Sequence, residues 1–398
     1  MNRCRPARRV CRKRPRTRCY TARMLAGHAS AEGTARFRDR FPAAREAGHF
    51  RRAAHVRGAG ELWLSSVGLG TYLGQPDAEA DSAYAAAITE ALRRGVNVLD
   101  TAINYRHQRS ERNIGEALAA LVAAGERQRD EVVVCTKAGY LSFDGDMPRD
   151  PRAYFLKEYV ESGILDPAEV AGGSHCMAPK YLANQLERSR QNLGLATIDV
   201  FYVHNPESQV GEVDANTFRQ RLRAAFEMME GAAAENKVRY YGVATWNGFR
   251  VRNGQRGGMS LEATVEAARE AGGAGHHLRF VQLPYNLGML EAFGVKNQRV
   301  AEEELSALEA AAQLGVIAVG SATLSQGQLS SGLPEFIRER LGAASDAEAA
   351  IQFARSTPGM AVALVGMGQK EHVAANLGVA GRPLASPEQW NSLFEQRD

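Results

Sequence analysis

The chain has 398 residues, of which 24% are charged and 44% hydrophobic, as is ordinary for a globular protein. No apolar run approaches the roughly 18 residues of a membrane-spanning helix, so no segment that crosses a membrane is expected. Residues 1–31 hold ten Lys and Arg residues and no acid, so the net charge of +4 becomes −6 over residues 32–398. That mildly acidic remainder gives no indication of nucleic-acid binding by the folded part.

The Arg-rich head, residues 1–31, allows several interpretations. It could bind nucleic acid or an anionic membrane nonspecifically, or act as a transit peptide. It could also be a disordered start that precedes the true initiator, Met24. Its three cysteines are spaced seven and eight residues apart, unlike the close pairs of zinc sites. Only Cys135 and Cys176 remain elsewhere, which predicts no disulfide framework and a cytoplasmic location.

Residues 26–60 mix Gly, Ala, Arg and aromatic residues without a firm period, which predicts a linker or a loosely packed arm. Beyond them, short apolar runs alternate with stretches of helical period. The expected strands are 66–71, 96–100, 132–136, 198–204, 238–244, 280–284, 316–320 and 361–366. The expected helices are 81–94, 111–124, 181–193, 217–235, 261–271, 300–314 and 346–356, and a closing helical segment begins at 372–377.

Eight strands that alternate with helices predict parallel strands with crossover helices, and so a (β/α)8 TIM barrel of the α/β class. An open doubly wound sheet remains the alternative. We expect a basic, disordered extension and arm over 1–60, one barrel domain over 61–385 and a tail over 386–398. Two long loops, 139–179 and 205–216, follow expected strands at the carboxyl-terminal face, where barrel enzymes build substrate pockets.

Four polar residues lie at or just beyond the ends of three of these strands. Asp100 ends the second strand and Tyr105 follows it, Lys137 directly follows the third strand and His204 ends the fourth. A lysine ammonium within ~4–6 Å of a tyrosine stabilises the phenolate and lowers the tyrosine pKa, and an aspartate can hold that lysine in place. The set suits protonation of a carbonyl oxygen while a nicotinamide cofactor supplies hydride to its carbon.

Each of these residues also has a structural explanation when it is taken alone. Asp100 could cap a helix, Tyr105 could pack on the rim and His204 could be a core histidine. Lys137 is harder to explain in this way, because lysine is rarely buried without a partner. The occurrence of all four at strand ends favours an active site.

Five segments together resemble the signatures of the aldo-keto reductases. They are Gly68-Leu69-Gly70-Thr71, Asp100-Thr101-Ala102-Ile103-Asn104-Tyr105, Ser110-Glu111-Arg112-Asn113-Ile114-Gly115, Thr136-Lys137 and His204-Asn205-Pro206-Glu207. The resemblance covers about residues 61–380 and implies a barrel that binds NADPH at its carboxyl-terminal face. It implies that Tyr105 is the general acid, that Lys137 tunes it, that Asp100 pairs with Lys137 and that His204 positions the substrate carbonyl.

The same resemblance implies the cofactor-binding positions. They are Gly70, Thr71 and Asp100 for the nicotinamide ribose, Gln282 for the carboxamide, Thr245 at a position of polar contacts, Ser321 at the position that stacks on the nicotinamide, Leu324 and Gln326 in the pyrophosphate loop, and Gly366, Met367, Gly368, His372 and Asn376 for the adenine end. Several differ from the family pattern: Ala244 and Thr245 stand where relatives usually have Ser and Asn, and Ser321 stands at the position of an aromatic residue that stacks on the nicotinamide. His372 stands near the position of an arginine for the 2′-phosphate, and Lys370 could substitute, so NADPH is expected and NADH use is possible.

The sequence therefore predicts an NAD(P)H-dependent reductase of a small aldehyde or ketone, with no metal. The main alternative is a nicotinamide-binding regulatory subunit or redox sensor with little or no catalysis. A barrel hydrolase or an aldolase that uses Lys137 as a Schiff base is a weaker one, because a lysine paired with Asp100 stays protonated. Two further alternatives concern the long loop: His175 and Cys176 could bind a metal with His204, and Cys176 could be a redox-sensitive thiol. The particular substrate and the oligomeric state are not encoded in a readable pattern.

Overall fold

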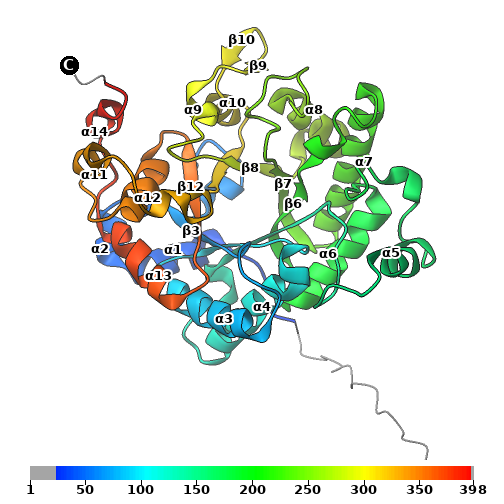
Figure 1. The fold of residues 1–398 in the computed structure, drawn as a ribbon, viewed down its shortest axis with the longest axis horizontal. Coiled ribbons are helices and arrows are strands. Elements are labelled where there is room, and N and C mark those ends of the chain that lie inside the picture. The colour runs from blue at the N-terminus through cyan, green and yellow to red at the C-terminus, as the bar shows by residue number, and fades with distance from the viewer. Residues whose placement is uncertain (1–23, 396–398) are drawn as a thin grey trace, which may run out of the picture.

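The protein is described by a computed structural model that defines residues 24–395. Eight parallel strands form a closed barrel in the order β11-β12-β3-β4-β5-β6-β7-β8 (Figure 1). These strands are β3 (Val67–Gly70), β4 (Val98–Asp100), β5 (Val133–Ala138), β6 (Ile198–His204), β7 (Val238–Ala244), β8 (Leu278–Pro284), β11 (Ile317–Ser321) and β12 (Met360–Gly366). The predicted (β/α)8 barrel is confirmed.

A ring of helices surrounds the barrel and buries its outer face. The helices are α3 (Ala78–Arg93), α4 (Arg109–Ala123), α6 (Pro179–Leu193), α7 (Ala215–Ala234), α8 (Leu261–Gly272), α10 (Ala307–Gln313), α12 (Asp346–Ser356) and α13 (Lys370–Asn376). In α3 the buried face consists of Tyr84, Ala87, Ile88, Ala91 and Leu92, at the 3.6-residue period of one helix face. Continuous apolar strands between two packed layers explain why the barrel could be predicted from the sequence.

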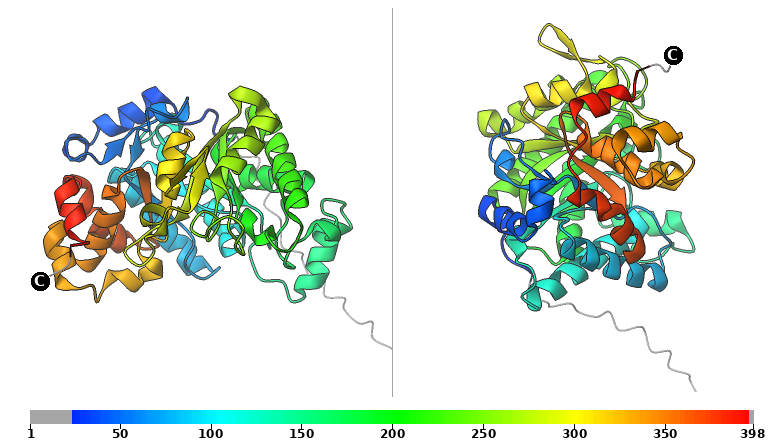
Figure 2. Two further views of the ribbon diagram at one scale, coloured as in Figure 1. Left: turned by 90° about the horizontal axis from the view of Figure 1, so that it is seen from above. Right: turned by 90° about the vertical axis from the view of Figure 1, so that its left-hand side faces the viewer.

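The segment before the barrel differs from the expected loose arm. Residues 24–65 contain α1 (Ala31–Asp39) and α2 (Pro42–Glu46), and β1 (Phe50–Arg51) pairs antiparallel with β2 (Leu64–Ser65). Val56, Ala59 and Leu62 are buried in one cluster with residues of the barrel interior. Figure 2 shows this blue segment gathered on one side of the barrel. The arm therefore closes the amino-terminal end of the barrel, and burial orders it although its elements are short.

Two other regions differ from the predicted elements. The predicted helix over 300–314 begins only at Ala307, because Ser306 and Glu309 form a capping box there. The residues before it form a hairpin of β9 (Gln298–Val300) and β10 (Glu303–Leu305). The expected tail contains α14 (Pro387–Ser392), whose Trp390 is buried and stacks on Phe353. Three short helices were not predicted: α5 (Pro151–Phe155), α9 (Glu291–Gly294) and α11 (Glu335–Leu341).

Residues 1–23, which carry most of the Arg-rich head, lie outside the described residues. Between residues 24 and 395, no helix is both long enough and apolar enough to cross a membrane.

Candidate active site

The carboxyl ends of β4, β5 and β6 bring three of the predicted residues together. Asp100 is the last residue of β4, Lys137 is the fifth residue of β5 and His204 ends β6. The Lys137 ammonium lies 2.5 Å from an Asp100 carboxylate oxygen and donates to the Thr101 carbonyl at 2.7 Å. Lys137 is therefore a buried cation with a buried anionic partner, the arrangement that makes its burial tolerable.

Tyr105 joins this group from the 3₁₀ turn η2 (Tyr105–Gln108), which follows β4. Its ring centroid lies 5.0 Å from the Lys137 ammonium nitrogen and 5.8 Å from the His204 ring centroid, edge to face. The structure thus brings all four predicted catalytic residues into one cluster at the carboxyl-terminal face, in which Tyr105 is half-buried and the other three are buried.

Burial and charge act in opposite directions on Tyr105. Burial raises the pKa of Tyr105, and the Lys137 ammonium lowers it without cancelling that rise. The tyrosine therefore keeps its proton at neutral pH. For Lys137, burial opposes the charged form, but Asp100 and Tyr105 together raise the lysine pKa, so the ammonium persists. Burial raises the pKa of Asp100, against the pull of Lys137 and Gln282.

His204 is a neutral histidine, held by residues that the sequence did not assign to the site. Burial lowers the pKa of His204 well below 6.5, and its buried Nδ1 has no hydrogen-bond partner within the described residues. The Tyr140 ring packs edge to face on it at 5.2 Å, and His175 Nε2 lies 2.7 Å from the His204 carbonyl oxygen. A Cβ on Gly139 would lie 2.5 Å from that same oxygen, so only glycine fits there. The one signal in the sequence was the position of these residues in the long loop after β5.

The positions predicted for the nicotinamide end lie around the same cluster. The side-chain amide of Gln282 lies beside Asp100 and donates a hydrogen bond to its second carboxylate oxygen at 2.8 Å. Thr71 donates its amide and its hydroxyl to the Asp100 carbonyl, at 3.1 and 3.2 Å. Thr245 follows β7, and its amide donates to the Gln282 carbonyl at 2.8 Å. Gly70 ends β3, beside Asp100 in the sheet.

The positions predicted for the phosphates and the adenine lie after the last two barrel strands. Ser321 ends β11, and the loop that contains Leu324 and Gln326 has positive φ at Ala322, Ser325, Gln326 and Gly327. A left-handed residue that follows a residue of negative φ, as Ser325 follows Leu324, can turn backbone N–H groups toward an anion. Gly366 ends β12, Met367 and Gly368 follow it, and His372 and Asn376 lie on α13. His372 is exposed and Asn376 is buried.

The two alternatives at His175-Cys176 are not favoured by the geometry. Within residues 24–395, no group of three or more His, Cys, Asp or Glu side chains could hold a metal ion. Cys176 is fully buried, and burial raises the pKa of its thiol to about 11. A reactive cysteine needs a thiolate and access, and Cys176 has neither.

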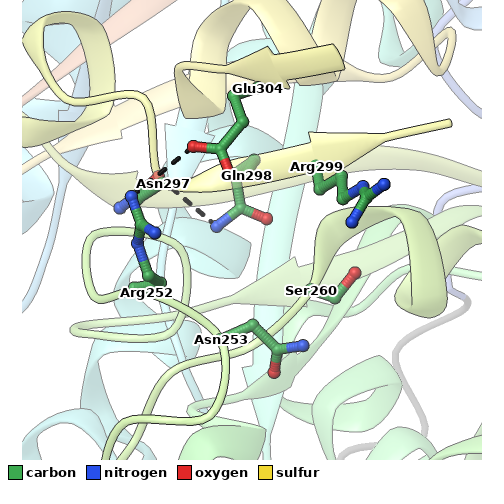
Figure 3. Close-up of a pocket in the computed structure, with 7 residues that line it drawn as sticks. All are labelled: Arg252, Asn253, Ser260, Asn297, Gln298, Arg299 and Glu304. Carbon is green, nitrogen blue, oxygen red and sulfur yellow. Dashed lines mark hydrogen bonds and ion pairs between the residues drawn. The ribbon is translucent and has the colours of Figure 1, made fainter. Parts of the chain in front are cut away.

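Two hollows lie at the periphery of this face, and none of the four predicted catalytic residues lines either. A polar pocket of about 220 Å³ is lined by residues from the β7–α8 loop and the β9–β10 hairpin, including Arg252, Ser260 and Gln298 (Figure 3). An apolar pocket of about 530 Å³ lies between the segment after β8 and Phe394.

A closed parallel barrel that carries a tyrosine, a buried lysine–aspartate pair and a histidine at its carboxyl-terminal rim is a (β/α)8 scaffold of the kind on which enzymes build active sites at that rim. The chain belongs to the aldo/keto reductase family, whose model matches residues 66–335.

Several known proteins are similar to this chain. It is 27% identical over 197 residues to L-glyceraldehyde 3-phosphate reductase of Escherichia coli (strain K12), which is 49% of this chain and 46% of that protein. It is 29% identical over 205 residues to D-threo-aldose 1-dehydrogenase of Pseudomonas sp, which is 48% of each chain. The match thus spans about half the length of these relatives.

Two solved structures share the fold. Glycerol dehydrogenase from Gluconobacter oxydans superimposes with a TM-score of 0.59 at 19% identity, over 87% of this chain and 94% of that chain. An aldo-keto reductase from Klebsiella pneumoniae in complex with NADPH does so with a TM-score of 0.56 at 20% identity, over 87% and 97%.

Proposed function

We propose that the protein is an NADPH-dependent reductase of small aldehydes or ketones, with Tyr105 as the general acid. The observation that carries this proposal is the buried Lys137–Asp100 pair directly beneath the Tyr105 ring. A structural tyrosine needs no buried cation next to it. An acid that must give up its proton does need one, since the cation stabilises the phenolate that remains.

The chain's own residues divide the work around a substrate carbonyl. Tyr105 donates the proton to the carbonyl oxygen, and Lys137 stabilises the charge left on Tyr105. Asp100 and the Thr101 carbonyl hold Lys137 in place. His204 is neutral, so its ring can orient the carbonyl oxygen without competing as a strong acid.

The residues present fit a nicotinamide dinucleotide. Gln282 offers an amide beside Asp100, and the left-handed turn over 322–327 offers backbone N–H groups for a pyrophosphate. Gly70, Thr71 and Thr245 would hold the nicotinamide end, and Gly366, His372 and Asn376 the adenine end. When bound, the cofactor supplies the hydride that no side chain can provide. The names of the two relatives support sugar-like carbonyl compounds as the substrate class.

The test compares wild type with Tyr105→Phe. NADPH and NADH binding would be measured by fluorescence titration, and turnover with a panel of aldehydes that includes hydroxylated and phosphorylated ones. We expect both proteins to bind NADPH and only the wild type to turn over. Binding without turnover in the wild type would point to the regulatory or sensing role, which is favoured by Ser321 in place of a stacking aromatic and by Ala244 and Thr245 in place of Ser and Asn. No binding of either nucleotide would refute both.

A further inference from the structure

The backbone directly after Tyr105 is held in an unfavourable conformation. Arg106, His107 and Gln108 have φ values of 48°, 55° and 71°, three successive left-handed residues, none of them glycine. Side chains with a Cβ avoid this region, so such a run persists only where the surroundings impose it. Since the run begins one residue after the proposed acid, whatever imposes it also sets the place of Tyr105.

The side chain of Arg106 helps to hold this turn, together with that of Gln108, which donates to the Phe143 carbonyl at 2.9 Å. Arg106 is 6% exposed and donates to acceptors on three separate segments. Its Nε donates to the Gln75 carbonyl at 2.8 Å, its Nη1 to the Asn113 side-chain oxygen at 2.8 Å, and its Nη2 to an Asp81 carboxylate oxygen at 2.6 Å. The guanidinium also lies over the Tyr84 ring, 5.1 Å from its centroid. One planar group thus ties the turn to the β3–α3 loop, α3 and α4.

The loop that Arg106 anchors also covers Tyr105. Residues 71–77 connect β3 to α3, and within them the ring of Tyr72 packs edge to face on Tyr105, with centroids 5.0 Å apart. The Tyr84 hydroxyl on α3 donates a hydrogen bond to the Leu73 carbonyl at 2.7 Å, which holds the same loop against α3. Tyr72 is itself 57% exposed, so it forms the outer wall of the cluster.

We propose that Arg106 is a positioning residue, which holds the Tyr105 hydroxyl over Lys137 and the 71–77 loop over Tyr105. The inference rests on the proposed function, because it assigns Arg106 a role in that same proton transfer. Arginine suits this role where lysine does not, since its rigid fork can donate in several directions at once. Asp81 completes the clamp, because its second oxygen accepts from Arg109 Nη1 at 2.6 Å.

The experiment uses Arg106→Lys and Arg106→Gly, with Arg93→Gln as a matched control. Arg93 lies on α3 and makes an exposed ion pair with Glu126. Lysine keeps the charge at position 106 but loses the fork, whereas glycine removes the clamp and accepts the left-handed backbone. We expect kcat to fall at least tenfold in both variants, since a misplaced acid commonly costs that much, while the NADPH dissociation constant stays within about threefold. Arg93→Gln should match the wild type.

A second measurement separates positioning from general loss of structure. Hydrogen exchange should quicken in residues 71–77 and 104–108 of both Arg106 variants, and the alkaline limb of the kcat profile should shift because Tyr105 moves relative to Lys137. Asp81→Asn, which keeps the shape of the partner, is the substitute if the Arg106 variants do not fold.

Wild-type kcat and unchanged exchange in the variants would overturn the inference and leave the proposed function intact. A wild type that reduces no carbonyl would instead refute the proposed function, and it is recognised before any variant is made.

Discussion

Lys137 keeps its charge inside the barrel because Asp100 and the Thr101 carbonyl accept two of its hydrogens. The variant Lys137→Met measures how much the Lys137 charge contributes to the acidity of Tyr105. Loss of the cation raises the pKa of Tyr105 further, so the tyrosine becomes a weaker acid and the alkaline limb of the kcat profile moves to higher pH. We expect kcat to fall by about 10²-fold, a typical contribution of general acid catalysis.

This prediction needs a control for the Asp100 carboxyl, which loses its partner in Lys137→Met. The double variant Lys137→Met, Asp100→Asn removes both charges and should show the same slow rate. An unchanged alkaline limb in both proteins would mean that another group sets it. Rates would be measured between pH 6 and 11 with saturating NADPH.

His49 gives the clearest dependence of stability on pH. Burial lowers its pKa to about 3, and its ring bonds to Ser66 and to the Gly95 carbonyl. Below pH 6.5, His49 is protonated in the unfolded chain but stays neutral in the native state. The free energy of unfolding therefore falls as the pH drops toward 3. Between pH 7 and 4.5 we expect His49 to account for a loss of about 2–3 kcal/mol. Urea unfolding at both pH values should show a smaller loss in His49→Gln; an equal loss would contradict this assignment.

Some residues of the site could be predicted from the sequence and others could not, because only the former lie at the ends of apolar strands. Asp100, Lys137 and His204 interrupt apolar strands, and parallel strands in a barrel bring such interruptions to one rim. The role of Arg106 could not be predicted in this way, because Arg106 does not interrupt an apolar strand. Its hydrogen bonds to Gln75, Asp81 and Asn113 form only in the folded protein. The pairing of Gln282 with Asp100 across the barrel was likewise invisible in the sequence.

At the scale of elements, the segment that closes the amino-terminal end contributes to stability and not to chemistry. Leu62 is 3% exposed in the cluster that fills the barrel interior. Leu62→Ala should lower the free energy of unfolding by about 2–4 kcal/mol through the cavity it leaves. Because the proposed site lies at the other end of the barrel, kcat should not change. Leu156→Ala, at an exposed leucine, should shift stability by no more than about 0.5 kcal/mol. A large fall in kcat for Leu62→Ala would show that the two ends are coupled.

Elements that lie between two buried layers could be predicted from the sequence, and elements ordered by docking could not. The strand β6 is buried at every position and apolar over residues 200–203, because both of its faces are covered. The two-residue strands β1 and β2 carry no period, and the β9–β10 hairpin replaced the first half of a predicted helix. Residues 302–304 are three successive glutamates, which offer no apolar face to the barrel.

At the scale of the whole molecule, the proposed cofactor positions come from five neighbouring strands of the barrel. Gly70, Ser321 and Gly366 end β3, β11 and β12, Thr245 directly follows β7, and Gln282 lies two residues before the end of β8. A ligand that contacts five of eight strands is bound by the native state and not by the unfolded chain. NADPH at about a hundred times its dissociation constant should therefore stabilise the protein by about 2.7 kcal/mol.

The size of that stabilisation in different variants tests whether the two ends of the barrel act independently. Tyr105→Phe keeps the positions proposed for the cofactor, and Leu62→Ala alters only the amino-terminal end. Free energies of distant, independent sites add, so both variants should gain the same stabilisation from NADPH as the wild type, to within about 0.5 kcal/mol. Urea unfolding with and without NADPH measures this directly. A smaller gain in Leu62→Ala alone would mean that the closing segment shapes the cofactor rim through the strands. No gain in any of the three proteins would mean that the rim does not bind this nucleotide, and Tyr105 would lose the source of hydride that its role requires.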